Sequence, residues 1–278
     1  MRIHFKKAMF GRTLIFVLLC LFCSFILAPL SWMLATTLRL PLESFRIPPS
    51  LLPTSFNLDS YRLVFEKVDF FAFVQNSIKI AVCCTALHVV CSSMAAFAFA
   101  RLDFPGKKWI FFLFLSALMI PSQVMNIPRF IIMSKIRLVD THAALILPSL
   151  FGAMGIFLIR QFMMTIPKSY DEAAHIDGAG RFYCYLHIIM PMTKPALIVI
   201  ALQTFIANWN DFYNPLIYLN SVSKMTLPLG LTALQSTLDT GNQSAILAGI
   251  LLSLIAPLLF FLIGQRYLIE GIQIGGIK

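Results

Sequence analysis

The chain has 278 residues, of which 59% are hydrophobic and only 12% are charged. Soluble globular domains carry about 25% charged residues, so this composition excludes an ordinary soluble protein and indicates a membrane protein. The net charge of +10 does not indicate a nucleic-acid partner, because the basic residues border apolar segments without an aromatic–basic patch, and membrane topology with anionic lipid explains them better.

The first apolar run covers residues 14–35 and follows a basic N-terminal segment. A spanning helix needs about 20 mostly apolar residues, and this run is long enough. A basic start followed by an apolar run also fits a secretory signal peptide. The run is longer than the core of a usual signal peptide, and no small-x-small cleavage site follows it, so we interpret it as a retained first transmembrane helix.

Five further apolar segments follow along the chain, and each is long enough, or nearly so, to span a bilayer. They cover residues 72–100, 109–133, 143–159, 195–219 and 244–265. The third of these five is short, and the fourth contains several polar residues. We therefore predict an all-α, polytopic membrane protein with six transmembrane helices, organised as a single transmembrane domain over residues 1–278.

The distribution of Lys and Arg predicts the orientation of the chain. More of them lie in the N-terminal segment, in the loop "RLDFPGKK", around residues 160–194 and in the tail than in the longer loops on the other side. Cytoplasmic loops of membrane proteins carry this excess. We expect a multi-pass protein of the cell membrane with both termini cytoplasmic and residues 38–71 outside.

The cysteines and the ionisable residues of the spans give weaker signals. The six cysteines lie mostly inside apolar segments, and none stands at metal-binding spacing from a His or an acid, so we predict packing roles and no metal site. Thr85, His88 and Ser92 share a helix face. His88 is either a proton relay or a hydrogen-bonded packing histidine, and we favour packing. Lys79 and Arg129 are expected near outer span ends, with their charges directed outward.

The segment 165–191 is unusually polar for this chain. Ser169 and Glu172 stand at the spacing of a capping box, which predicts a short helix running to about Asp177. Gly178 then suits the left-handed residue that ends a helix. A second helix is expected to carry one apolar face formed by Phe182, Tyr185, Leu186 and Ile189. Such a rigid helix–turn–helix, exposed on the cytoplasmic surface, is suited to be held by another protein.

Polar residues gather toward the outer end of the 195–219 segment, where a polar solute would need hydrogen-bonding partners. Gln203 and Asn210 are seven residues apart, so a continuous helix places them on one face, and Asn214 extends that face. Trp209 offers a stacking surface for a sugar. We predict a solute path formed by Gln203, Asn208, Trp209, Asn210, Asp211 and Asn214. The alternative is that these amides hold helices together.

The polar segment also carries a resemblance. Its Glu-Ala-Ala, Gly178, Ile188 and Pro191 resemble the EAA loop of binding-protein-dependent ABC transporter permeases. Further stretches resemble, in order, the smaller, maltose-permease-like subunit of carbohydrate importers: "NSIKIAV", "AAFAFARLDFPGKK", "MIPSQVMNIP", "ANWNDFYNPLIYL", "MTLPLGL" and "QRYLIEGIQIGGIK". The departures from the family pattern are Tyr185, Met190 and Arg129. Arg129 stands in a normally apolar place and reflects either a particular substrate or a snorkelling contact.

The resemblance implies a permease subunit of an ATP-driven importer for a carbohydrate or similar polyol. It assigns coupling to a separate ATPase subunit to Glu172, Ala173, Ala174 and Gly178, while Asp177 either adds a second charge or lies beside the turn. It also implies a complex with a second permease, two ATP-binding subunits and an extracytoplasmic solute-binding protein. The chain has no G-x-x-x-x-G-K-[ST] sequence, so we expect no catalysis here, with ATP and Mg bound by the partner.

A stand-alone secondary transporter or channel is the alternative function. It would need a coupling-ion or filter site, usually built from carboxylates near the membrane midplane. No predicted span has an Asp or Glu near its centre, and Asp211 is the nearest. A membrane enzyme is less favoured, because the sequence offers no nucleophile–base or metal constellation.

Overall fold

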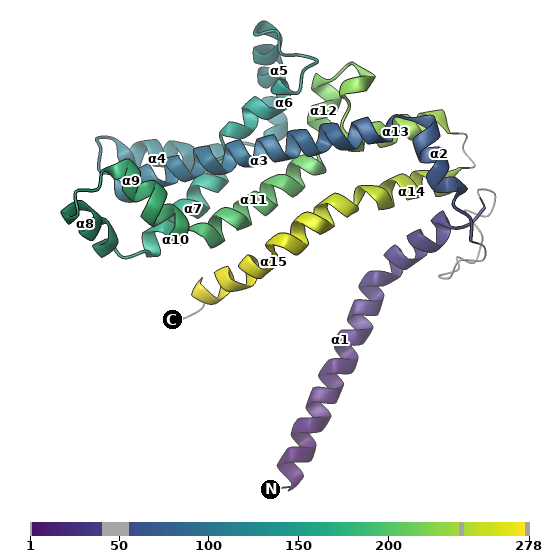
Figure 1. Cartoon of the computed structure of the whole chain (residues 1–278), viewed down its shortest axis with the longest axis horizontal. Helices are drawn as coiled ribbons and strands as arrows, with labels where there is room; N and C mark the ends of the chain where they lie inside the picture. The colour runs from purple at the N-terminus through teal and green to yellow at the C-terminus, as the bar shows by residue number, and fades with distance from the viewer. Residues whose placement is uncertain (1, 41–55, 239–241, 276–278) are drawn as a thin grey trace. The chain divides into compact units, whose positions relative to one another are not determined.

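The computed structural model describes residues 2–40, 56–238 and 242–275, which form helices and no strand (Figure 1). The predicted all-α class is therefore confirmed. In chain order the α-helices are α1 (Arg2–Thr37), α2 (Asp59–Lys67), α3 (Phe70–Arg101), α4 (Lys107–Ser116), α5 (Asn126–Lys135), α6 (Ala143–Ile146), α7 (Ala153–Thr165), α8 (Ser169–Ile176), α9 (Arg181–Cys184), α10 (Met190–Met192), α11 (Lys194–Trp209), α12 (Tyr213–Tyr218), α13 (Leu227–Thr237), α14 (Gln243–Ser253) and α15 (Ile255–Gly275). Short 3₁₀ turns cover Ala117–Met119, Ser122–Met125, Leu147–Leu150 and Val222–Lys224, and Tyr185–Ile189 is a π-helix.

Four described segments are long and apolar enough to cross a membrane, namely Arg12–Thr37, Phe70–Arg101, Ala143–Thr165 and Gln243–Gln265. Two bent helix pairs raise this number to six if each pair is one span. They are Lys107–Met119 with Ser122–Lys135, bent by 99°, and Arg181–Met192 with Lys194–Trp209, bent by 77°.

Several of the predicted spans are interrupted rather than continuous helices. The 109–133 span breaks at Pro121, where the preceding Ile120 is extended, as expected for a residue before proline. The 143–159 span is interrupted at Phe151 and Gly152, both of which are extended, and its helix then continues to Thr165. These breaks free backbone groups and open space between helices.

The chain divides into two compact units. One contains Met1–Asp69 and Leu231–Leu254, and the other contains Phe70–Gly230 and Ile255–Lys278. The single domain over residues 1–278 thus stays a prediction. In the first unit, α14 contacts both α1 and α2. The backbone of Gly249 lies against the side chains of Leu231, Leu234 and Val64, where an added Cβ would come within 2.7 Å of Leu231.

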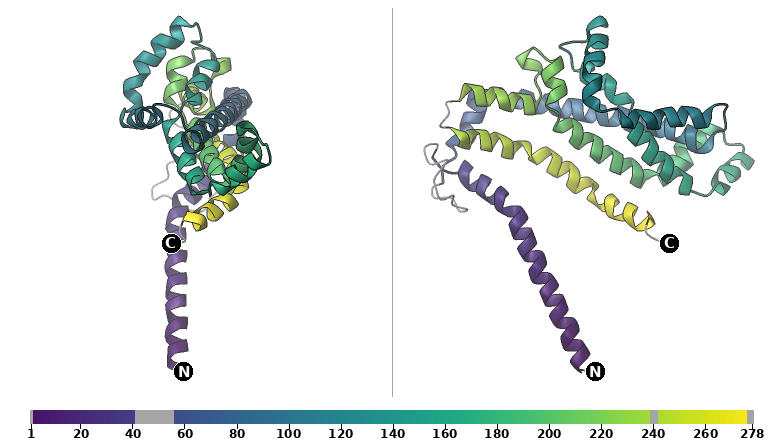
Figure 2. Two further views of the ribbon diagram at one scale, coloured as in Figure 1. Left: turned by 90° about the vertical axis from the view of Figure 1, so that its left-hand side faces the viewer. Right: turned by 180° about the vertical axis from the view of Figure 1, so that it is seen from behind.

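The second unit is built around α3. Helices α7 and α11 pack along α3, and α15 packs along α11 (Figures 1 and 2). Gly264 of α15 lets this last pair approach closely, since an added Cβ would lie 2.7 Å from Leu202. At one end, a buried cluster joins α3, α7 and α11 to the segment from α8 to α10; it includes Phe97, Ile159, Met163, Ala174, Tyr185, Ile189 and Ile200.

Candidate functional site

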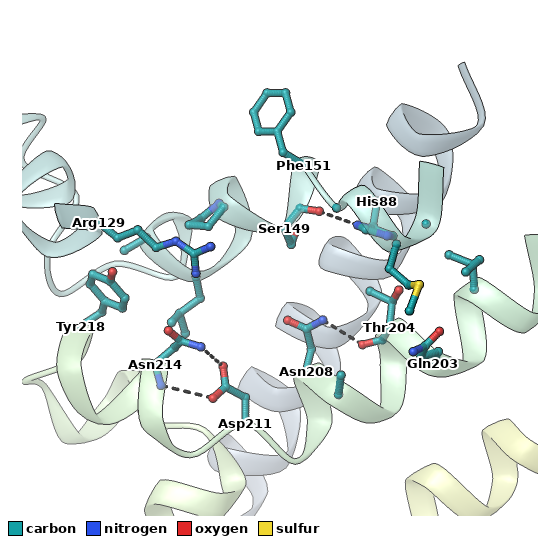
Figure 3. Close-up of a pocket in the computed structure, with 18 residues that line it drawn as sticks. His88, Arg129, Ser149, Phe151, Gln203, Thr204, Asn208, Asp211, Asn214 and Tyr218 are labelled. Atoms are coloured by element: carbon teal, nitrogen blue, oxygen red, sulfur yellow. Dashed lines mark hydrogen bonds between the residues drawn. The ribbon is translucent and has the colours of Figure 1, made fainter. Parts of the chain in front are cut away.

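The second unit contains a pocket of about 320 Å³ lined by residues of α3, α5, α6, α7, α11 and α12 and of the turns between them (Figure 3). Most of its polar side chains come from the stretch 203–218, and the others come from three segments far from it in the sequence. The polar lining residues are His88, Arg129, Ser149, Gln203, Thr204, Asn208, Asp211, Asn214 and Tyr218.

A break between α11 and α12 positions the polar residues at one end of the pocket. Helix α11 ends at Trp209, and α12 begins at Tyr213. Asp211 lies between them and accepts two hydrogen bonds from Asn214, from the backbone N–H at 3.2 Å and from Nδ2 at 2.7 Å (Figure 3). Asp211 therefore holds the first turn of α12, which satisfies a backbone N–H that a new helix leaves free.

Of the residues predicted to form a solute path, four line the pocket: Gln203, Asn208, Asp211 and Asn214. Asn210 is exposed and is not among the lining residues. The expectation that it shares the face of Gln203 assumed a continuous helix, whereas α11 ends one residue before it.

Trp209 also lies outside the pocket, and only 3% of it is exposed. Its ring is stacked on Phe205 at a centroid distance of 6.0 Å, and Phe205 in turn is stacked on Phe260 at 4.0 Å. Trp209 therefore packs between helices in this structure rather than offering its ring to a sugar.

His88 occupies a narrow slot in the pocket wall. Its Nδ1 lies 2.8 Å from the carbonyl oxygen of Ser149 and donates the hydrogen bond, because a carbonyl only accepts (Figure 3). Two glycines make room for the ring. A Cβ at Gly152 would lie 2.0 Å from His88 Cε1, and one at Gly155 would lie 2.5 Å from Nε2. The structure thus shows the hydrogen bond and the close packing that the favoured interpretation of His88 requires.

Arg129 is a pocket residue that the predicted solute path did not include. It was expected to direct its charge outward, but the structure places it among the lining residues on α5 (Figure 3). The cause is the 99° bend between Lys107–Met119 and Ser122–Lys135, which a straight 109–133 helix does not contain. Its departure from the apolar family pattern was the available signal.

Asp140, which lies between α5 and α6, bonds to the segment that follows α12. Its carboxylate accepts hydrogen bonds from the backbone N–H groups of Asn220 and Ser221, both at 2.9 Å, and pairs with Lys224 Nζ at 2.9 Å. The hydrogen bond from Lys224, followed by those from Ser221 and Asn220, lowers the pKa of Asp140 far below its usual range. The segments before α6 and after α12 are thereby joined.

The second candidate site is the segment from α8 to α10, which we call the coupling segment. Gly178 has a φ of +78°, and so the predicted left-handed residue is confirmed. The Ala179 N–H donates to the Ala174 carbonyl at 2.8 Å, and the Gly178 N–H donates to His175 at 3.1 Å, which together form a Schellman motif. The capping-box prediction is wrong, because the N-cap is Lys168 and no side chain caps α8.

The residues assigned to coupling differ in exposure. Glu172, Ala173, Asp177 and Gly178 are exposed, whereas Ala174 is only 5% exposed and belongs to the buried cluster of its own chain. Ala174 therefore anchors α8 from within, and its side chain offers little surface to a partner. Ile176, which the sequence reasoning did not single out, is 85% exposed at the end of α8 and adds an apolar contact surface.

The helix after the turn departs from the predicted apolar face. Its buried residues include Cys184, Tyr185 and Ile189, whereas Phe182 is 67% exposed and Leu186 is 42% exposed. Leu186 lies inside the π-helix over Tyr185–Ile189, whose i→i+5 hydrogen bonds widen the turn relative to an α-helix, whereas Phe182 lies before it. Projection at 3.6 residues per turn therefore assigned part of the face wrongly.

Arg101 fastens the coupling segment to the end of α3. Its side chain is 5% exposed, and Nη1 lies 3.1 Å from Asp171 Oδ2 in α8. Its Nη2 donates to the carbonyl oxygen of Ile166, after α7, at 2.9 Å. The Cys184 thiol lies 3.3 Å from the other oxygen of Asp171. Helix α3, the end of α7 and the coupling segment thus meet at one buried guanidinium.

A family model described as "Binding-protein-dependent transport system inner membrane component" matches residues 88–272. The arabinooligosaccharides transport system permease protein AraQ of Halalkalibacterium halodurans is 33% identical over 251 residues, covering 87% of this chain and 90% of that protein. AraQ of Bacillus subtilis is 30% identical over 278 residues, covering 99% and 98%.

One further relative and one solved structure are also similar to this chain. The sn-glycerol-3-phosphate transport system permease protein UgpE of Escherichia coli is 30% identical over 239 residues, covering 83% of this chain and 84% of that protein. A chain from the crystal structure of a bacterial ABC transporter involved in the import of the acidic polysaccharide alginate has a TM-score of 0.80. It covers 95% of this chain and 98% of its own length at 22% identity, which shows the shared fold.

Proposed function

The chain belongs to the binding-protein-dependent transport system inner membrane components, and from this premise we propose that its pocket forms part of the path of a carbohydrate or similar polyol. It is a multi-pass cell-membrane protein and a permease subunit of an ABC importer, which works in a complex with other subunits. The observation that carries the proposal is the convergence of amide, hydroxyl and charged side chains on one pocket in an otherwise apolar chain.

The names of its relatives and the chemistry of the pocket support this class of solute. According to their names, the relatives described above transport arabinooligosaccharides and sn-glycerol 3-phosphate. Both solute classes carry many hydroxyl groups. Gln203, Asn208 and Asn214 supply side-chain amides that donate and accept hydrogen bonds, which suits hydroxyl groups that do the same.

The coupling segment is the proposed contact for an ATP-hydrolysing subunit. Glu172 and Ala173 lie exposed within a short helix, and Asp177 and Gly178 lie exposed at its C-terminal end. Ala174 supports this surface from within. The proposed complex contains a second permease, two ATP-binding subunits that hold ATP and Mg, and an extracytoplasmic solute-binding protein. Both termini and the coupling segment lie in the cytoplasm in this arrangement.

One experiment with the complete transporter in liposomes tests both halves of the proposal. Gln203→Leu should lower ATP-dependent carbohydrate uptake about tenfold without loss of ATPase-subunit binding, because it removes a polar pocket group. Glu172→Lys should lower both uptake and binding of the ATPase subunit, because it reverses an exposed charge at the proposed contact.

Asn210→Leu provides the matched control, since Asn210 lies one residue beyond α11 and outside the pocket. Its uptake should stay close to the wild type. Equal loss of uptake in Gln203→Leu and Asn210→Leu would contradict the path, and intact uptake in Glu172→Lys would contradict the coupling surface. Transport by the isolated chain without ATP would favour a stand-alone transporter or channel.

A further inference from the structure

Arg129 carries a charge in the pocket without a direct counter-ion. No ion pair within 4.0 Å and no hydrogen bond engages its guanidinium in the described part of the chain. Two other arginines of the same unit show the usual arrangement. Arg101 pairs with Asp171 at 3.1 Å, while Arg160 donates to the Phe99 carbonyl and lies 4.2 Å over the ring of Phe111.

The carboxylate of the pocket does not neutralise Arg129. Asp211 is the one acid among the lining residues, and it forms no ion pair with Arg129. Instead, both of its oxygens accept hydrogen bonds from Asn214, and this interaction fixes the start of α12. The pocket therefore contains one carboxylate occupied by an internal contact and one guanidinium still open to a ligand.

An unpaired cation is costly in an apolar setting, and it marks a functional position when it faces a cavity. Arg129 sits in an apolar stretch, between Pro128 and Phe130, yet Figure 3 shows its side chain extending on the side of the pocket that carries Tyr218 and Asn214. The guanidinium is a planar fork of donors that matches the two oxygens of a carboxylate or a phosphate.

We propose that this pocket receives the anionic group of an acidic carbohydrate, either a carboxylate or a phosphate, on Arg129. The inference rests on the proposed function and narrows its solute class. The amides of Asn208, Asn214 and Gln203 then contact the hydroxyl groups of the same molecule. A volume of about 320 Å³ suits a small solute or one end of a longer chain.

The test uses the complete transporter with its binding protein and its ATPase subunits. Uptake is measured for digalacturonate, sn-glycerol 3-phosphate and neutral galactobiose, in the wild type, Arg129→Gln and Arg129→Lys. The wild type should transport at least one of the anions. Arg129→Gln should lower uptake of that anion about tenfold and leave the neutral sugar within about twofold, because one charged fork is lost. In Arg129→Lys, uptake of that anion should fall between the values for the wild type and for Arg129→Gln, since lysine keeps the charge and loses the planar fork of donors.

The two anionic probes distinguish a carboxylate from a phosphate. ATP-dependent uptake of galactobiose with neither anion transported would overturn the inference and leave the carbohydrate importer intact. Equal losses for all solutes in Arg129→Gln, with a lower yield of assembled complex, would overturn it in favour of an acidic residue of the second permease as the counter-ion. Absence of ATP-dependent uptake for every carbohydrate would instead reject the proposed function.

Discussion

The pocket and the coupling segment belong to the same compact unit, but they are built in different ways. The pocket gathers side chains from six helices and their turns, and its polar groups depend on helix breaks that bring distant residues together. The coupling segment obtains its turn from hydrogen bonds among neighbouring residues. The difference teaches that a substitution in the pocket acts through packing, whereas one at the turn acts through local backbone conformation.

Both regions nevertheless depend on α3. His88 contributes to the pocket, and Arg101 holds the coupling segment. They are separated by thirteen residues of one helix, or about 20 Å at a rise of 1.5 Å per residue. A displacement of the coupling segment can therefore reach the pocket along a single rigid helix.

The largest effect is expected from Gly152→Ala in the pocket. Its new Cβ would lie 2.0 Å from His88 Cε1, so the ring must leave its slot and lose the bond to Ser149. Overpacking of this kind lowers the free energy of unfolding by about 3 kcal/mol. The melting temperature and the solute uptake should fall, while the ATPase subunit still binds.

The double variant Gly152→Ala with His88→Ala separates packing from other causes. Removing the ring relieves the contact, so thermal stability should recover in part relative to Gly152→Ala alone. A double variant no more stable than the single one would show that the clash with His88 is not the cause.

A smaller effect is expected from Arg101→Gln at the other end of α3. The change leaves Asp171 without its cation and removes a donor from the Ile166 carbonyl. Because the Asp171 side chain is 26% exposed, we expect the free energy of unfolding to fall by about 2 kcal/mol, which is less than for a fully buried ion pair. ATP hydrolysis should become less coupled to uptake, as measured by the ratio of the two rates in liposomes.

Asp171→Asn in the Arg101→Gln background tests the pairing directly. The double variant should be less destabilised than the sum of the two single variants. Strict additivity in thermal unfolding would argue against the ion pair as the link. Arg160→Gln serves as a control, because this arginine contacts Phe99 and Phe111 and makes no ion pair with α8.

The smallest effect is expected from Gly178→Ala at the turn. No atom lies within 4 Å of the added Cβ, so the cost comes from the φ of +78° and amounts to about 1 kcal/mol. Gly180→Ala is a matched control, because its surroundings are equally open and its φ is −71°. Uptake and thermal stability should decline only in Gly178→Ala, and equal behaviour of the two variants would contradict the role of the turn.

The sequence predicted features that depend on long apolar runs or on local turn chemistry. The helical class and the left-handed Gly178 belong to this group. Hydropathy alone does not mark the helix breaks, because apolar residues continue through them, although Pro121 stands at one of the breaks. The placement of Arg129 and Asn210 followed from assuming straight helices through 109–133 and 195–219.

Exposure was harder to predict than secondary structure. Ala174 and Trp209 were each assigned a functional surface from residue type and motif, yet both are buried within their own chain. Whether a small or aromatic side chain faces a partner depends on which neighbours pack against it, and some of these neighbours come from distant helices. Trp209 is stacked on Phe205 of its own helix, and Phe205 in turn is stacked on Phe260 of α15.

The π-helix over Tyr185–Ile189 has a consequence for protein engineering. A π-turn contains one residue more than an α-turn, so deleting one residue from this stretch would convert it to ordinary helix and leave the following helix in phase. An ordinary α-helix of the same number of residues would instead rotate everything after it by about 100°. A chimaera that exchanges this part of the molecule with that of a related transporter must therefore keep Tyr185–Ile189 whole.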